Sequence, residues 1–177
     1  SVNDPQASQQ YSLSEMQVYN AWDTTQGDGI VVAVLDTGAE FSHPDLQGKF
    51  VSRGKDFVNG DDDASDDQGH GTHVSGIVAA ATNNGVGIAG VGYNTRVLPV
   101  KVLNSGGAGD YGRIANGITW AADQGVKVIN MSLGGASGAS TLESAVKYAW
   151  TKGVVVVCAA GNSSTSAPAY PAAYENC

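Results

Sequence analysis

The chain has 177 residues, of which 42% are hydrophobic and 15% charged, which is enough to form one folded domain. Nine Lys and Arg residues against seventeen Asp and Glu residues give a net charge of −8, which disfavours nucleic-acid binding. The longest apolar run, residues 154–160, is too short to span a bilayer, and no cationic and apolar leader opens the chain. We expect no nucleic-acid or membrane partner, and a protein that either is not exported or has lost a leader.

Four short runs rich in Val and Ile predict the strands of a buried sheet. Near-continuous β-branched runs are typical of parallel strands that are covered on both faces. The runs span residues 30–35, 97–102, 126–131 and 154–159. Between the first two runs, residues 53–69 are polar and rich in Asp, and they predict a surface loop.

Three amphipathic patterns between these runs predict helices. The second pattern begins at a capping residue, Asp110, and ends at Gly125. The third opens with Ser140 and Glu143, which have the spacing of a capping box. The expected helices span residues 70–82, 110–124 and 140–152.

The alternation of strands and helices predicts one α/β domain over residues 1–177, with a doubly wound, mostly parallel sheet and helices on both faces. After residue 160 the chain continues as a loop rich in Ser, Ala, Pro and Tyr, so we expect the sheet to be incomplete at the C-terminus. Cys158 and Cys177 do not make a disulfide scaffold, and three states stay open for them. They pair with each other, pair with a partner elsewhere, or stay free.

Asp36 directly follows the first predicted strand, where the functional groups of open α/β sheets lie. In isolation it is equally a turn or helix cap. Asp36, Thr37 and Gly38 are also similar to the active-site stretch of retroviral-type aspartic proteases. Those proteins are all-β, and the alternating strand and helix pattern argues against that fold.

His70 and His73 lie at the start of the first predicted helix, three residues apart. This spacing allows a metal pair, but zinc peptidase helices place their histidines four residues apart and add a Glu, which is missing here. A single buried structural His is the plain alternative. A catalytic His that faces the end of the Asp36 strand fits better, because an Asp there would orient the imidazole and stabilise its charged form.

Asn162 follows the last predicted strand, and Ser132 and Gly135 bound a short segment after the third. Asn162 is either a turn residue or a side-chain donor for a developing oxyanion. The glycines of residues 132–135 either let a substrate backbone approach closely or form an ordinary exit from the strand.

Taken together and in chain order, these motifs resemble those of subtilisin-like serine proteases, the subtilases. The resemblance covers nearly the whole chain. Within the family, the surroundings of Trp22 and residues 83–85 and 149–153 look most like the thermitase-like and related Bacillus-type branch. The motifs that carry the resemblance are residues 34–38, 43–46, 70–76, 132–135 and 159–162.

The resemblance implies a role for each matching residue in peptide-bond hydrolysis. Asp36 would be the carboxylate of the catalytic triad, His70 the general base and Asn162 the oxyanion donor. Two segments would pair with a polypeptide substrate, and a third would line the primary specificity pocket. In that order these are Gly107, Ala108 and Gly109; Ser132, Leu133 and Gly134; and Ala159, Ala160 and Gly161.

The resemblance also implies bound Ca²⁺, which prefers six to eight oxygen ligands. The first site would use the side chains of Asp4, Asp45 and Asn84 with the carbonyl groups of Thr82, Val86 and Ile88. A second site would lie in the acidic loop, although the plain interpretation of that loop is a solvated acidic surface. Its ligands would be Asp56, Asp61 and Asp63, with Asp62, Asp66 and Asp67 nearby.

The family's Gly-Thr-Ser-Met-Ala element, which carries the nucleophile, does not occur in these 177 residues. We therefore expect this chain alone to be inactive and the Ser nucleophile to lie on a missing segment or a second chain. The alternative is an inactive subtilase fragment that binds peptide or a partner chain. The resemblance further implies secretion, and a pro-segment or a proteinaceous inhibitor as partners.

Overall fold

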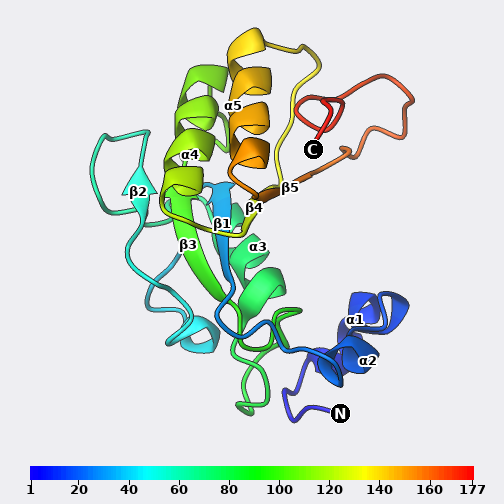
Figure 1. The fold of residues 1–177 in the computed structure, drawn as a ribbon. Helices are drawn as coiled ribbons and strands as arrows, with labels where there is room; N and C mark the ends of the chain where they lie inside the picture. Colours follow the sequence, from blue (N-terminus) through cyan, green and yellow to red (C-terminus); the bar gives the residue numbers. More distant parts are fainter.

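A parallel sheet of five strands in the order β2-β3-β1-β4-β5 forms the centre of the computed structural model, which describes residues 1–177 (Figure 1). The predicted α/β fold class is therefore confirmed, and each of the four expected runs coincides with a strand whose ends differ from the expected ones by at most two residues. The strands are β1 (Val31–Asp36), β2 (Lys55–Asp56), β3 (Arg96–Lys101), β4 (Val128–Met131) and β5 (Val155–Cys158).

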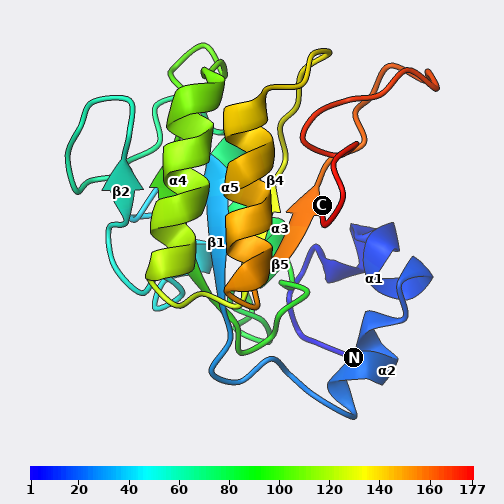
Figure 2. The same cartoon turned by 45° about the horizontal axis from the view of Figure 1, so that its top comes forward.

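Strand β1 lies in the middle of the sheet, and its side chains alternate between two apolar layers. Val32 and Val34 pack with α3 (His70–Ala79) on one face. Ala33 and Leu35 point to the opposite face, which α4 (Tyr111–Asp123) and α5 (Ser140–Thr151) cover together. Figure 2 shows α4 and α5 side by side in front of the sheet, with α3 behind it. This arrangement explains why β1 is apolar at every position before Asp36.

The ends of the two front helices test the capping predictions. The Asp110 carboxylate accepts a hydrogen bond from the Arg113 N–H at 2.9 Å, as a helix cap does. The capping box predicted at Ser140 is wrong, because the cap residue is Ala139 and no side chain caps the helix. Glu143 instead forms an ion pair with Lys147 at 2.8 Å.

Strand β5 differs from the expectation that every strand is covered on both faces. Val155 and Val157 are 54% and 45% exposed. The reason is that β5 is an edge strand and α3, which covers the far face of the sheet, packs on β1 and β3. The predicted surface loop also holds one surprise, since Lys55 and Asp56 pair with β3 as the other edge strand.

Residues 1–24 form a small helical unit for which the sequence patterns made no prediction. Its elements are η1 (Ala7–Gln9), α1 (Tyr11–Glu15) and α2 (Val18–Trp22). Outside this unit, one more short helix, η2, spans Pro44–Leu46. The unit packs its own apolar cluster against Ala89. The Gln10 amide also bonds both the N–H and the C=O of Ala89, at 2.8 and 2.9 Å. None of the helices in this structure is both long and apolar enough to cross a membrane.

Cys158 and Cys177 form a disulfide, which resolves the three states left open by the sequence. The bond joins the end of β5 to the last residue and closes the intervening segment into a loop. Tyr170 fixes the same loop through two backbone hydrogen bonds with Gly135, both at 2.8 Å. The Tyr174 hydroxyl adds bonds to both backbone groups of Ala139. The 159–176 loop is therefore held at its end and in its middle.

Removing this disulfide should destabilise the protein measurably. Replacing both Cys158 and Cys177 by Ser is expected to lower the free energy of unfolding by about 3 kcal/mol, since the cross-link restricts the unfolded chain. Chemical denaturation measures this change, and a Ser166→Ala variant in the same loop serves as the control. An unchanged unfolding midpoint in both the double variant and the reduced wild type would contradict the prediction.

Candidate active site

The predicted functional residues gather at one edge of the sheet, because all five strands run parallel and end there. Asp36 is the last residue of β1, while Ser132 and Ala159 directly follow β4 and β5. The register confirms that these ends are level, since Met131 lies opposite Cys158. Functional groups of open parallel sheets occupy this edge in general.

Asp36 and His70 form a direct pair. The carboxylate of Asp36 is fully buried, and its two oxygens lie 2.8 and 3.0 Å from Nδ1 of His70. An ionised carboxylate only accepts hydrogen bonds, so Nδ1 carries the proton and Nε2 is left free to accept one. The imidazole side chain is 47% exposed, so Nε2 is accessible to a ligand. The metal-pair alternative receives no support, because Nδ1 of His70 is engaged by Asp36 and the two histidines line different cavities.

Close packing of two backbones sets this pairing. A side chain at Gly71 would collide with the backbone of Gly38, so the start of α3 lies directly against the turn after β1. Gly38 itself has φ +110° and faces the carbonyl group of Ala64, where no side chain fits. These two glycines explain why a helix that begins at His70 can bring the imidazole to Asp36.

The first turn of α3 also needs partners for its free N–H groups, and loop side chains supply them. The N–H of His70 donates to Gln68 Oε1 at 2.8 Å, and that of Gly71 donates to Thr37 Oγ1 at 2.8 Å. The N–H of Thr72 donates to Asp66 Oδ2 at 3.0 Å. The cap residue itself, Gly69, has no side chain that could accept these hydrogen bonds.

Asp66 is the residue whose importance the sequence analysis missed, since it was considered only as a neighbour of the acidic calcium site. Burial opposes its charge, but hydrogen bonds from Gly69, Thr72, Gln68 and Thr37 outweigh burial and hold the pKa of Asp66 well below its usual value. The stabilisation from these bonds is present above the pKa of the unfolded chain and is lost only as the pH falls through the lower folded value. No capping signal in the sequence indicated Asp66, because the cap position is Gly69 and Asp66 lies three residues before it.

The predicted substrate segments line a cleft of about 580 Å³ next to His70, which we call the His70 cleft. Gly107, Ala108 and Gly109 lie on it together with Ser132, Leu133 and Gly134. The backbone groups of residues 132–134 make no hydrogen bond within the chain. The His70 cleft also has an apolar part, formed by Leu103, Tyr111, Ile114 and Leu133.

A second cleft, of about 600 Å³, adjoins the first along residues 132–135, and we call it the Asn162 cleft. Asn162 is exposed there, and its side-chain amide makes no hydrogen bond within the chain. Ala159, Ala160 and Gly161 line the same cleft. The structure thus places the three predicted pocket residues and the predicted oxyanion donor in one cleft. His70 lines the other cleft, and residues 132–135 line both.

The first predicted calcium site has its side chains in one place. Asn84 bridges the two acids, because its N–H donates to Asp4 at 3.1 Å and its amide donates to Asp45 at 2.9 Å. Asp4 and Asp45 are both buried. The backbone carbonyl groups of the other proposed ligands accept no hydrogen bond, although they lie in the same tightly wound loop; these ligands are Thr82, Val86 and Ile88. The residues present are oxygen donors of the kind that Ca²⁺ prefers, since each oxygen of Asp4 and Asp45 accepts a single hydrogen bond and the three carbonyl groups accept none.

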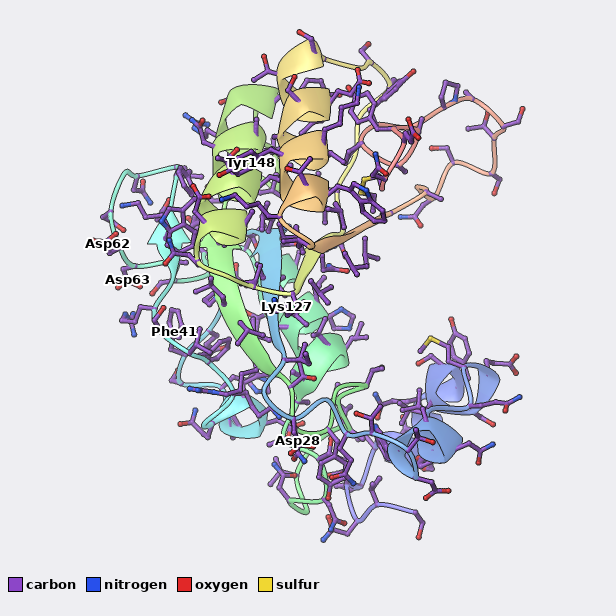
Figure 3. All side chains as sticks on the ribbon, in the orientation of Figure 1. Asp28, Phe41, Asp62, Asp63, Lys127 and Tyr148 are labelled. Carbon is purple, nitrogen blue, oxygen red and sulfur yellow. A yellow bond between two sulfur atoms is a disulfide. The ribbon has the colours of Figure 1, made fainter.

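The residues proposed for the second calcium site lie close together in the acidic loop, where Asp56 and Asp61 form a backbone bridge and the N–H of Asp63 donates to Asp61 Oδ1 at 2.9 Å, but two of the three carboxylates are engaged by other partners. Asp56 is buried and accepts three hydrogen bonds from residues 58 and 59, while the Asp63 carboxylate pairs with Arg53 at 2.8 Å. The hydrogen bond from Arg53 lowers the pKa of Asp63. Arg53 in turn lies over the ring of Phe41, and Figure 3 shows Asp63 on the outer loop above that ring. No cluster of three or more acidic, His or Cys side chains in this structure is arranged to hold a metal.

Gly71 offers a direct test of the backbone packing. A Gly71→Ala variant is expected to lose about 1–3 kcal/mol of stability, because the added methyl group must push α3 away from the turn after β1. Thermal unfolding measures this loss. Gly125→Ala is the control for a glycine with open space around it, whose cost comes from its φ of +80° alone. A Gly71→Ala variant as stable as the wild type would show that the contact is not tight.

Comparisons with known proteins agree with this geometry. Residues 27–177 match the subtilase family. The chain is 52% identical to thermitase of Thermoactinomyces vulgaris, over 98% of this chain and 62% of that protein. It is 51% identical to the thermophilic serine proteinase of Bacillus sp. (strain AK1), over 94% of this chain and 42% of that protein.

The fold is also similar to that of a solved structure. A protease from Pseudoalteromonas arctica PAMC 21717 superposes with a TM-score of 0.89 at 38% sequence identity, over 98% of this chain and 63% of that chain. The chain therefore spans less than two thirds of the relatives that it matches. The α/β fold also overturns the aspartic-protease alternative for Asp36, which needs an all-β protein. On the family match and on these identities, the chain belongs to the subtilase family.

Proposed function

We propose that this chain is the part of a subtilisin-like serine endopeptidase that supplies the acid, the base and one oxyanion donor. The observation that carries the proposal is the Asp36–His70 pair at the edge of an open cleft, with Nδ1 of the imidazole 2.8 Å from the buried carboxylate. The relatives named as proteases support the same conclusion. The nucleophilic Ser would lie on a segment outside these 177 residues, consistent with the greater length of those relatives.

The geometry assigns each residue a step in acyl transfer. Asp36 holds the imidazole with Nδ1 protonated, so Nε2 of His70 takes the proton from the attacking Ser hydroxyl as the bond to the substrate carbonyl carbon forms. Asp36 also stabilises the imidazolium produced in that step. His70 then returns the proton to the leaving amine when the peptide bond breaks. In the second half, His70 takes a proton from a water molecule as its oxygen bonds to the acyl carbon, and returns that proton to the Ser oxygen as the acyl–Ser bond breaks, which releases the acid product.

Asn162 would stabilise the negative charge that develops on the substrate oxygen. Its amide is exposed in the Asn162 cleft and has no partner within the chain, so no competing hydrogen bond needs to be broken. A preorganised donor of this kind stabilises the transition state by about 3–4 kcal/mol in other enzymes. The small residues beside it, Ala159, Ala160 and Gly161, leave room for a large substrate side chain.

A polypeptide would bind in extended form along the His70 cleft. Ser132, Leu133 and Gly134 offer backbone N–H and C=O groups that are free of other hydrogen bonds, and Gly109 on the opposite wall does the same. Pairing through backbone groups gives affinity with little sequence preference. The proposed substrates are therefore unstructured polypeptide segments.

The proposed function is tested on the full-length protein with a fluorophosphonate probe and a chromogenic peptide. Wild type is expected to be labelled on a Ser outside this chain and to cleave the peptide. The His70→Ala variant is expected to lose labelling and at least about 10⁴-fold in kcat, the scale of triad loss in serine proteases, while its unfolding temperature stays close to wild type. Peptide binding by a wild type that neither labels nor cleaves would instead favour the inactive peptide-binding alternative.

We infer in addition that the first calcium site is occupied in solution. Asp4, Asp45 and Asn84 would hold the ion, and it would supply charge that stabilises the tightly wound loop rather than chemistry for hydrolysis. No such inference is made for the acidic loop, because Asp63 is engaged by Arg53.

Chelation should reveal that ion. Adding a strong chelator is expected to lower the melting temperature, by an amount that corresponds to about 2.7 kcal/mol if free Ca²⁺ was one hundred times its dissociation constant. Asp45→Asn should remove most of the response, whereas Asp61→Asn, in the acidic loop, should keep it. A melting temperature that ignores the chelator in wild type would refute the calcium proposal, and a response lost in Asp61→Asn would move the ion to the second site.

We also propose that the protein acts outside the cytoplasm, as the resemblance to secreted subtilases implies. The Cys158–Cys177 disulfide supports this location, because disulfides persist in oxidising compartments.

A further inference from the structure

Asp66 accepts more hydrogen bonds than Asp36 or His70, although it contacts neither the His70 imidazole nor the His70 cleft. One carboxylate oxygen accepts from the hydroxyl of Thr37 at 2.8 Å and from the N–H groups of Gln68 and Gly69 at 3.0 and 2.9 Å. The other accepts from the N–H and the hydroxyl of Thr72 at 3.0 and 2.5 Å. A single side chain therefore bonds the turn after β1, the loop before α3 and the first turn of α3.

Thr37 connects this centre to the catalytic carboxylate. Its hydroxyl donates to Asp66 and accepts from the N–H of Gly71, while its own N–H donates to Asp36 Oδ1 at 2.7 Å. Thr37 follows Asp36 and Gly71 follows His70, so the Thr37 hydroxyl connects the two backbone segments that carry the catalytic groups. The direct bond between His70 and Asp36 is one of two routes that connect the pair, and the second runs through Thr37.

A buried ammonium group holds Thr37 from the other side. Lys101, at the end of β3, is 1% exposed and donates to the carbonyl of Thr37 at 2.6 Å, to the carbonyl of Leu103 at 2.8 Å and to Asp67 at 2.7 Å. Asp66 and Asp67 are adjacent, so the same loop is bonded to α3 through one carboxylate and to β3 through the next. Residue 37 consequently has little freedom to move relative to His70.

We propose that Asp66, acting through Thr37, is a positioning residue that sets the distance between His70 and Asp36. The inference rests on the proposed protease function, which assigns the pair its chemistry. Only a carboxylate satisfies all the donors around Asp66, because both of its oxygens accept. An Asn would turn its NH₂ group either toward the N–H of Thr72 or toward those of Gln68 and Gly69, and would leave at least one backbone N–H without an acceptor.

The expected consequence is kinetic. Small misplacements of a catalytic group cost up to about 10²-fold in rate, whereas the substrate-binding backbone is left unchanged. Asp66→Asn is therefore expected to lower kcat by about 10–100-fold with KM within about threefold of wild type. Thr37→Val, which keeps the shape but removes the hydroxyl, should have the same effect, and Thr37→Ser should restore most of the rate.

The control for charge is Asp62→Asn, which makes the same change four residues away on an 84% exposed side chain paired with Lys55. It should keep both kinetic constants. A loss of kcat as large as in Asp66→Asn would mean that the effect is long-range electrostatics and would overturn the proposal. A lower melting temperature in Asp66→Asn with unchanged kcat in the folded enzyme would also overturn it, since Asp66 would then be merely structural.

A spectroscopic measurement separates this inference from the proposed function. In the full-length protein, the Nδ1–H proton of His70 should give a slowly exchanging low-field NMR signal, because Asp36 accepts from it in a buried site. The signal should persist in Asp62→Asn and Thr37→Ser and be broadened or lost in Asp66→Asn and Thr37→Val. This result would support the positioning role even if no peptide is cleaved. An intact signal in Asp66→Asn would refute it whether or not the protein is a protease.

Discussion

The contact between the end of β1 and the start of α3 is the constraint on which the site depends. A central strand delivers Asp36 in a fully buried position, and a helix on the far face of the sheet must begin within hydrogen-bond distance of it. Two glycines without room for side chains allow the backbones to approach. Free helix N–H groups then need acceptors, and the side chains that provide them come from the same turn and loop.

This requirement explains why so many polar groups are buried around the Asp36–His70 pair. A buried carboxylate is costly unless it is hydrogen-bonded, so Asp36 accepts from both Thr37 and His70. The same reasoning applies to Lys101, whose buried ammonium group has three acceptors. The polar network and the apolar layers on both faces of β1 support each other, since neither the pair nor the sheet edge would be ordered alone.

Two irregular segments, the 82–90 loop and the loop that carries Asn162, are fixed by cross-links to other parts of the chain. The helical unit of residues 1–24 is bonded to the 82–90 loop through Asp4 and Gln10. The Cys158–Cys177 disulfide and Tyr170 hold the loop that carries Asn162. Irregular segments with few apolar contacts need such cross-links to hold a functional side chain in place.

Local patterns in the sequence were enough to predict the α/β class and the strands and helices with clear periodicity, and to single out Asp36, His70 and Asn162 as candidates through their motifs. Apolar periodicity and strand-end positions are local properties, so they can be interpreted from neighbouring residues. Only the folded chain shows the Cys158–Cys177 pairing, the absence of a side-chain cap at Ser140, the exposed face of β5 and the partners that engage the acidic residues of the 53–69 loop. It also identified Asp66, because its partners lie on three separate segments. These features depend on which distant groups meet, and hydrogen bonds between such groups leave no periodic pattern along the chain.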